Sequence, residues 1–425
     1  MTRDDLFRPM LLAALAVFAS GCVVQETRPL PQLQAVQATQ AIPDELLLDV
    51  GIRLFDPGIP PGLEDDPQKI EKTRIYPEIR RAEARYMPNQ LRDTLEGTAQ
   101  WGAVRVVPGL VEAMDVIVTG RILESTAAEL KLAIRAEDST GRVWLDRTFE
   151  GTADTRAYRQ GGSNGRDPFE NVYVNIANDL LAARQKLTAD DVRTVQRVSE
   201  LRFAAGFAPA AFGDYLAKDR RSGRYQLARL PAEGDPVFGR VSAIRERDDA
   251  LVDTVSDGYA AFSDRLDDAY LNYRRFSYDE IMAEDKLKAQ ARTRIALGVL
   301  AVAAGVLVPD SCSSSDCARV VDAARYGAVA GGVYGVMSGI RKGEESKMHT
   351  ATLREFAGSF QNEAEPLVVE IEGRTLRLTG TAEEQYAEWR RLLHELYEDD
   401  TGLVHQAPAA GSAAASPAPV KPGPG

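Results

Sequence analysis

Residues 128–136, AELKLAIRA, carry the pattern that decides the fold. Apolar residues stand at every second position, with charged or small residues between them, as in a strand that buries one face. A polar turn, DSTG, follows at 138–141, and a second apolar segment runs from 143 to 149. Asp and Ser form local hydrogen bonds in turns and Gly accepts positive φ, so the three segments predict an antiparallel hairpin. The alternating apolar residues are Leu130, Leu132 and Ile134.

Residues 44–155 are expected to form one small α+β domain around this hairpin. Residues 78–96 carry apolar side chains at helical spacing, and Pro88 within them predicts a kink or a break. Further strands are expected at 45–55, 103–107 and 115–122. The order is then strand, helix and four strands, which is typical of a sheet covered by a helix.

The sequences DVIVTGRI at 115–122 and STGRVW at 139–144 resemble a known domain type. It is the N-terminal domain of the Tol-system propeller protein, shared with the penicillin-binding-protein activator lipoproteins and the curli-secretion lipoprotein. The resemblance covers about a quarter of the chain and contains strands and turns, but no catalytic signature. It implies a periplasmic binding or assembly module. An unrelated ferredoxin-like or split α+β domain has the same strand pattern, so both interpretations stay open.

Residues 1–21 have the pattern of a secretory signal peptide. Basic residues precede the apolar run LLAALAVF at 11–18, and small residues follow it. The run is shorter than the roughly 20 residues that span a bilayer as a helix. The sequence ASGC at 19–22 resembles the lipobox of bacterial lipoproteins, although that family usually has Leu where Ala19 stands. The alternative is an ordinary cleaved signal peptide with a chance cysteine.

The lipobox resemblance implies a lipid anchor. Cys22 would become the mature N-terminus and carry acyl chains, and several chains are needed because one holds a protein only marginally. Val23 stands where retention in the inner membrane usually requires Asp, so the resemblance implies an outer-membrane protein that is mainly periplasmic. Residues 22–43 are rich in Gln and Pro without an apolar period, which predicts a flexible tether.

Residues 168–290 are expected to be mainly helical. Thr188, followed by two acidic residues at 190 and 191, is a predicted N-cap. Between Val241 and Tyr273, apolar residues recur at spacings of mostly three and four, with charges between them. This spacing predicts an amphipathic helix of coiled-coil type, roughly 50 Å long. Packing against the same chain and self-association both remain open for its apolar stripe.

Residues 291–341 have the pattern of a glycine-zipper helical hairpin. The stretch 295–308 has no charge, and a second apolar stretch at 323–340 has Gly at every fourth position. Gly costs about 1 kcal/mol in a helix relative to Ala, so a face of glycines indicates close approach of another helix. The predicted helix-packing residues are Gly298, Gly305, Gly327, Gly331, Gly335 and Gly339.

Two cysteines lie between the two halves of this predicted hairpin. In an oxidising compartment, Cys312 and Cys317 can form a disulfide that closes the loop. Three settings remain open for the hairpin as a whole. It can be buried in a soluble helical domain, form an oligomer interface or enter the membrane.

Residues 350–402 are expected to form a β-hairpin followed by a helix. The hairpin is predicted from the alternating segments at 367–372 and 375–379. Thr381 and Glu384 have the spacing of a capping box at the start of the helix. Residues 403–425 have the composition of a disordered tail.

The composition and the motifs indicate a non-catalytic protein. A net charge of −12 argues against a nucleic-acid partner, because phosphate binding requires a basic surface. None of the three histidines has a second ligand at zinc spacing, and no Gly-x-Ser-x-Gly or phosphate-loop motif is present, so no cofactor or metal is predicted. We expect an outer-membrane lipoprotein that acts in envelope assembly, secretion or scaffolding through other envelope proteins, with possible homo-oligomers. The alternative is a peptidoglycan-associated enzyme or an activator of a cell-wall synthase.

Overall fold

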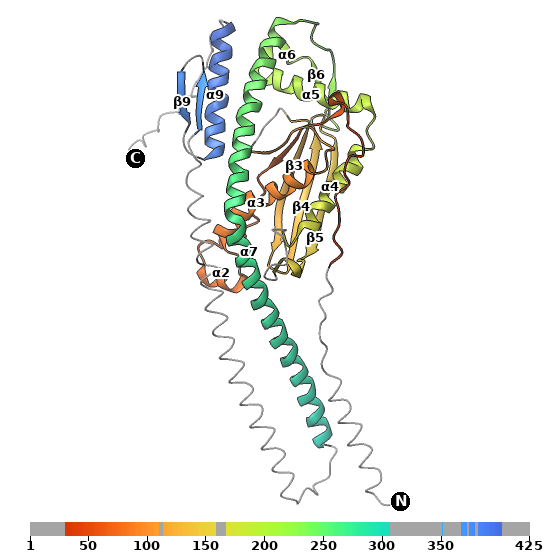
Figure 1. Cartoon of the computed structure of the whole chain (residues 1–425), viewed down its shortest axis with the longest axis vertical. Coiled ribbons are helices and arrows are strands. Elements are labelled where there is room, and N and C mark those ends of the chain that lie inside the picture. Colours follow the sequence, from red (N-terminus) through yellow and green to blue (C-terminus); the bar gives the residue numbers. More distant parts are fainter. Residues whose placement is uncertain are drawn as a thin grey trace, which may run out of the picture.

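The computed structural model shows an α+β protein, as predicted. It describes residues 30–109, 114–158, 167–306, 351, 367–371, 374–378 and 381–401. A five-stranded sheet forms the centre of the body, and one helix of 71 residues, α7 (Pro236–Val306), runs along the body and continues beyond it (Figure 1).

The sheet has the strand order β2-β1-β3-β4-β5. Strand β1 is parallel to both of its neighbours, whereas β3, β4 and β5 form an antiparallel meander. The predicted alternation is confirmed, because Leu130, Leu132 and Ile134 are 0%, 0% and 1% exposed. The strands are β1 (Val50–Arg53), β2 (Val104–Val107), β3 (Val116–Ser125), β4 (Glu129–Asp138) and β5 (Val143–Thr152).

The strand predicted at 45–55 is shorter than expected. A 3-10 turn, η1 (Asp44–Leu46), precedes it, with Leu46 N–H donating to the Pro43 carbonyl at 2.8 Å. Beyond Arg53 the regular strand ends, because the Phe55 N–H donates to the carbonyl of Ala84 in a helix at 2.9 Å, and Asp56 still pairs with β3 through a single bridge to Arg121. The apolar run therefore supplies a turn and a short buried strand.

Helix α3 (Pro77–Glu96) corrects the predicted break at Pro88. The helix is continuous through this proline, which is buried. Proline has no N–H for the carbonyl four residues earlier, which here belongs to Ala84. That carbonyl accepts the Phe55 N–H instead, so the proline leaves an acceptor that ties the chain after β1 to α3. A short helix, α2 (Pro67–Thr73), precedes α3.

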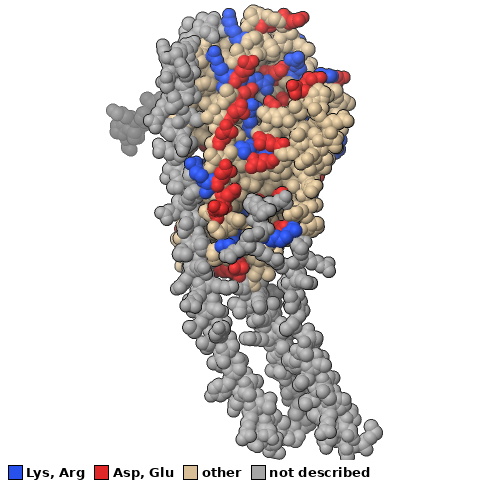
Figure 2. Space-filling model, viewed as in Figure 1, with Lys and Arg blue, Asp and Glu red and all other residues tan. Residues whose placement is uncertain are grey.

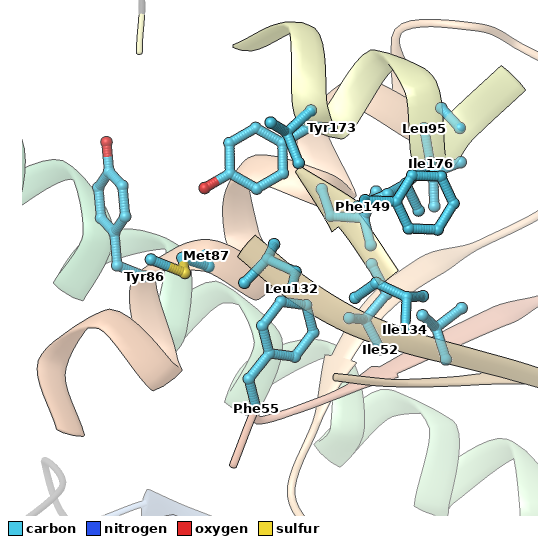
Figure 3. Packing of buried hydrophobic residues seen from close by; sticks show 14 of the residues in the cluster. Ile52, Phe55, Tyr86, Met87, Leu95, Leu132, Ile134, Phe149, Tyr173 and Ile176 are labelled. Carbon is cyan, nitrogen blue, oxygen red and sulfur yellow. The ribbon is translucent and has the colours of Figure 1, made fainter. Parts of the chain in front are cut away.

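Helices α3 and α4 (Glu170–Arg184) cover one face of the sheet (Figure 3). Tyr86 and Met87 of α3 and Ile176 of α4 pack against strand residues such as Leu132 and Phe149. The same cluster includes Phe262 and Leu266 of α7. Elements on both sides of residue 155, where the first domain was predicted to end, therefore share one hydrophobic core.

The region predicted as helical from residue 168 contains α4, α5 (Ala189–Phe207) and α6 (Pro209–Phe212). The N-cap at Thr188 is confirmed, and it forms a capping box with Asp191. A small hairpin of β6 (Leu216–Lys218) and β7 (Tyr225–Leu227) follows within the region predicted to be mainly helical. A 3-10 turn, η2 (Thr155–Tyr158), lies between β5 and α4.

The apolar stripe of α7 packs within the same chain. Val241, Val252 and Leu266 are at most 2% exposed, whereas charged residues lie on the outer face, where Figure 2 shows acidic and basic side chains intermixed. Helix α7 also covers the free edge of β2, since the Val106 N–H donates to Ser256 Oγ at 3.0 Å. Of the two alternatives for this stripe, the structure shows intrachain packing.

The C-terminal hairpin and helix are confirmed as β8 (Leu367–Ile371), β9 (Arg374–Leu378) and α9 (Ala382–Thr401). The Thr381 N–H donates to Glu384 Oε2 at 2.8 Å, and the Glu384 N–H donates to Thr381 Oγ1 at 3.2 Å, which is the predicted capping box. Helix α9 packs on α7, where Tyr386 donates to the buried Asp248 at 3.2 Å.

Residues 30–38, which lie within the predicted flexible tether, form a strap along α4. Asn171 accepts the Leu33 N–H at 3.0 Å and donates to the Pro31 carbonyl at 3.0 Å. Two helical turns later, Asn178 accepts the Val36 N–H at 2.9 Å and donates to the Gln34 carbonyl at 3.4 Å. Composition cannot indicate this, because the partners are side chains distant in sequence.

Replacing Asn171 and Asn178 together with Ala is expected to release the strap. The amide hydrogens of Leu33 and Val36 should exchange roughly fivefold faster, because each bond contributes about 1 kcal/mol. Asn175→Ala is the matched control, since Asn175 lies exposed on the same helix. Equal exchange rates in the double variant and the control would contradict the strap contacts.

Candidate functional site

Two aspartates lie side by side where two parallel strands begin. Strand pairing aligns Val50 with Val116, so the preceding residues, Asp49 and Asp115, are neighbours. Asp115 Oδ2 accepts the Asp49 N–H at 3.0 Å, and Asp49 Oδ1 accepts the Ala103 N–H at 2.8 Å. The two carboxylates thus accept hydrogen bonds from backbone N–H groups at the end of the sheet where β1 and β3 begin.

Gly102 allows this close approach. A Cβ atom at this position would lie 2.3 Å from Asp49 Oδ1, so any side chain would displace the carboxylate. The Gly102 N–H also donates to the Leu48 carbonyl at 3.0 Å, which fixes the segment before β2 against the segment before β1.

A cleft of about 740 Å³ opens above this edge, between η1, α5 and the first turns of α7. Gln196 of α5 donates to the Leu47 carbonyl at 2.8 Å and holds one wall against the segment between η1 and β1. Seven acidic and three basic residues line the cleft. They are Asp44, Glu45, Asp49, Asp115, Glu200, Glu246 and Asp249, with Arg193, Arg197 and Arg245.

Burial dominates the electrostatics of the deepest carboxyl group. It raises the pKa of Asp115 to about 7, with the neighbouring charge of Asp49 acting in the same direction and Arg245 opposing it. Burial also raises the pKa of Asp249, and here Arg245 and Arg105 oppose the shift. Arg245 Nε lies 3.9 Å from Asp249 Oδ2, and Arg105 Nη1 lies 3.6 Å from Asp49 Oδ2.

The arrangement favours a cationic ligand. Arg197 pairs with Glu200 at 2.8 Å and Arg245 lies near Asp249, so the acidic residues left for a ligand are Asp44, Glu45 and Glu246. A carboxyl group that titrates near neutral pH can accept a proton or a cation in its place. Within the described ranges, no group of three or more His, Cys, Asp or Glu residues is placed to hold a metal ion.

The residues selected from the sequence do not line this cleft. Gly298 and Gly305 belong to the distal backbone of α7, and His394 stacks on Phe207 with ring centres 4.2 Å apart. Among the helices that the structure describes, none has an apolar stretch of the length needed to cross a membrane. Outside the described residues lie Cys22, Cys312, Cys317, Gly327, Gly331, Gly335, Gly339 and the tail at 403–425.

Asp49 and Asp115 were not selected from the sequence, although a signal for them exists. Each is an acidic residue directly before a buried apolar strand, in LLLDVGI and MDVIV. The signal has meaning only when the two strands are known to be parallel neighbours in register. The walls contributed by α5 and α7 have no equivalent signal.

No protein-family model matches this chain, and a search of curated protein sequences finds no significant match.

Proposed function

We propose that the protein is a lipid-anchored scaffold of the bacterial outer membrane that binds a basic segment of an envelope partner in the cleft at the start of β1 and β3. The acidic excess of the cleft, with Asp115 at its base, is the observation that supports this proposal. The cleft offers carboxylate and amide groups, which bind by charge and hydrogen bonding, and it is about 740 Å³ in volume.

Site-specific photo-cross-linking in intact cells tests the cleft. A photoreactive residue at Glu246, which is exposed at the cleft, should capture a discrete partner, whereas one at the exposed Glu150 of β5 should not. Asp249→Arg should abolish capture from position 246, because it reverses a charge in the wall. The same products from both positions, or capture that survives the charge reversal, would reject the cleft as the binding site.

A second function has one observation in its favour. Burial raises the pKa of Asp115 to about 7, and the carboxylate of Asp49 lies beside it. Pairs of carboxyl groups in which one pKa is raised serve as general acids and bases in hydrolases. A peptidoglycan-associated enzyme would release soluble fragments from labelled peptidoglycan and lose this turnover in Asp115→Asn. An activator of a cell-wall synthase would bind the partner without releasing fragments itself.

A further inference from the structure

The start of the strap and the distal part of α7 lie at the same end of the body (Figure 1). Arg156 of η2 donates to the Leu30 carbonyl at 2.8 Å. Two residues further along η2, the ring of Tyr158 lies 5.1 Å from that of Tyr278 in α7. Contacts through one turn therefore place Leu30 close to the point where α7 leaves the body.

From this point, the reach of the chain back to Cys22 and the length of α7 out to Ile295 are similar. Between Cys22 and Leu30 the chain can span at most about 29 Å, since each residue extends by no more than about 3.6 Å. From Tyr278 to Ile295 the helix rises by about 26 Å, at 1.5 Å per residue. If Cys22 is held in a bilayer, the docked strap brings the body close enough for Ile295 to reach that bilayer.

The sequence of the distal part of α7 changes where the helix would meet the membrane. Four basic residues, and no acidic residue, lie between 286 and 294, and the apolar stretch from 295 to 306 follows. This stretch is about 18 Å long as a helix, close to the roughly 15 Å of one leaflet. Basic residues beside an apolar stretch are attracted by anionic headgroups, each contributing about 1 kcal/mol. They are Lys286, Lys288, Arg292 and Arg294.

We infer that residues 295–306 of α7 insert into the leaflet that holds the acyl chains of Cys22, with the basic residues at 286–294 on its headgroups. This inference rests on the lipid anchor of the proposed function. A second copy of the chain is the competing occupant. Parallel association of copies would bring their basic segments together, and like charges repel, whereas anionic lipid attracts them.

Vesicle flotation of the unacylated full chain tests the inference. The Cys22→Ser protein should float with vesicles of phosphatidylethanolamine and phosphatidylglycerol. Adding Leu300→Asp should weaken flotation at least about tenfold, because an acidic residue in the apolar region costs about 3 kcal/mol. Adding Ala250→Asp instead, at an exposed position of α7 on the body, is the matched control and should float like Cys22→Ser.

Three outcomes would overturn the inference. The first is a Cys22→Ser protein that stays in the aqueous fraction. The second is equal flotation of the Leu300→Asp variant. The third is a lipid-free oligomer in light scattering that Leu300→Asp dissociates, which would assign the apolar end to a second copy. Labelling of the wild-type protein with a palmitate analogue tests the anchor separately, so loss of the anchor and loss of the helix contact give different results.

Discussion

Replacement of Glu83 by Ala is expected to lower the free energy of unfolding by about 3–5 kcal/mol. Arg274 of α7 is 2% exposed, and its Nη2 lies 3.5 Å from Glu83 Oε1. The hydroxyl of Tyr270 donates to the same oxygen at 2.5 Å. Without the carboxylate, the buried guanidinium group keeps only the weaker attraction of Asp167 and has no access to water.

The Glu83 carboxylate connects three elements of the body. Ser125, at the end of β3, donates to Glu83 Oε1 at 2.7 Å and accepts a hydrogen bond from Arg274 Nη2 at 3.1 Å. The guanidinium group of Arg274 also lies 4.5 Å from the ring centre of Phe169. The network therefore fixes α7 to α3 and to the sheet, close to the place where α7 leaves the body.

Chemical denaturation of the variant measures the effect, and an exposed ion pair provides the control. Glu64 pairs with Arg81, but their side chains are 48% and 37% exposed, so Glu64→Ala should cost no more than about 1 kcal/mol. Adding Arg274→Met to Glu83→Ala should recover part of the loss, because the unpaired charge is removed as well. Similar losses in Glu83→Ala and Glu64→Ala would contradict the network.

The strands and amphipathic helices were predictable because their signals are local. The alternation at 130–134 and the apolar spacing after Val241 indicate which face of the strand or helix is buried, and this does not require knowing which element packs against that face. The kink or break predicted at Pro88 is wrong for the same reason. A local rule states that its ring removes a hydrogen bond, but the N–H of Phe55, which compensates for the loss, comes from a distant segment.

The strap and the cleft depend on long-range pairing, and sequence patterns do not contain it. In the sequence, Asn171 and Asn178 look like any polar residues on the exposed face of a helix. Only the structure shows that residues 30–38 lie beside them. Asp49 and Asp115 become neighbours only through the parallel register of β1 and β3. Only this register brings the two acidic residues together at the base of the cleft.

The stability of the wild-type protein relative to Asp115→Asn is expected to fall as the pH rises from about 4 to about 7. Burial raises the pKa of Asp115 to about 7 in the folded protein, from an ordinary value of 3.8. Between these values the folded state keeps a proton that the unfolded state releases, so raising the pH favours unfolding. The difference can reach about 4 kcal/mol, at about 1.4 kcal/mol per pKa unit. Asn keeps a carbonyl oxygen for the Asp49 N–H.

Urea denaturation of both proteins at intervals from pH 4 to pH 8 checks this, and Asp248→Asn is the matched control. Asp248 is also buried, beneath α9, and burial raises its pKa to about 6. Its difference curve should therefore become level near pH 6, whereas that of Asp115 should continue to fall until about pH 7. Parallel pH profiles for wild type and Asp115→Asn would show that the carboxyl group is ionised throughout. The cleft would then carry a fixed negative charge at its base, and its affinity for a basic segment would not weaken below pH 7.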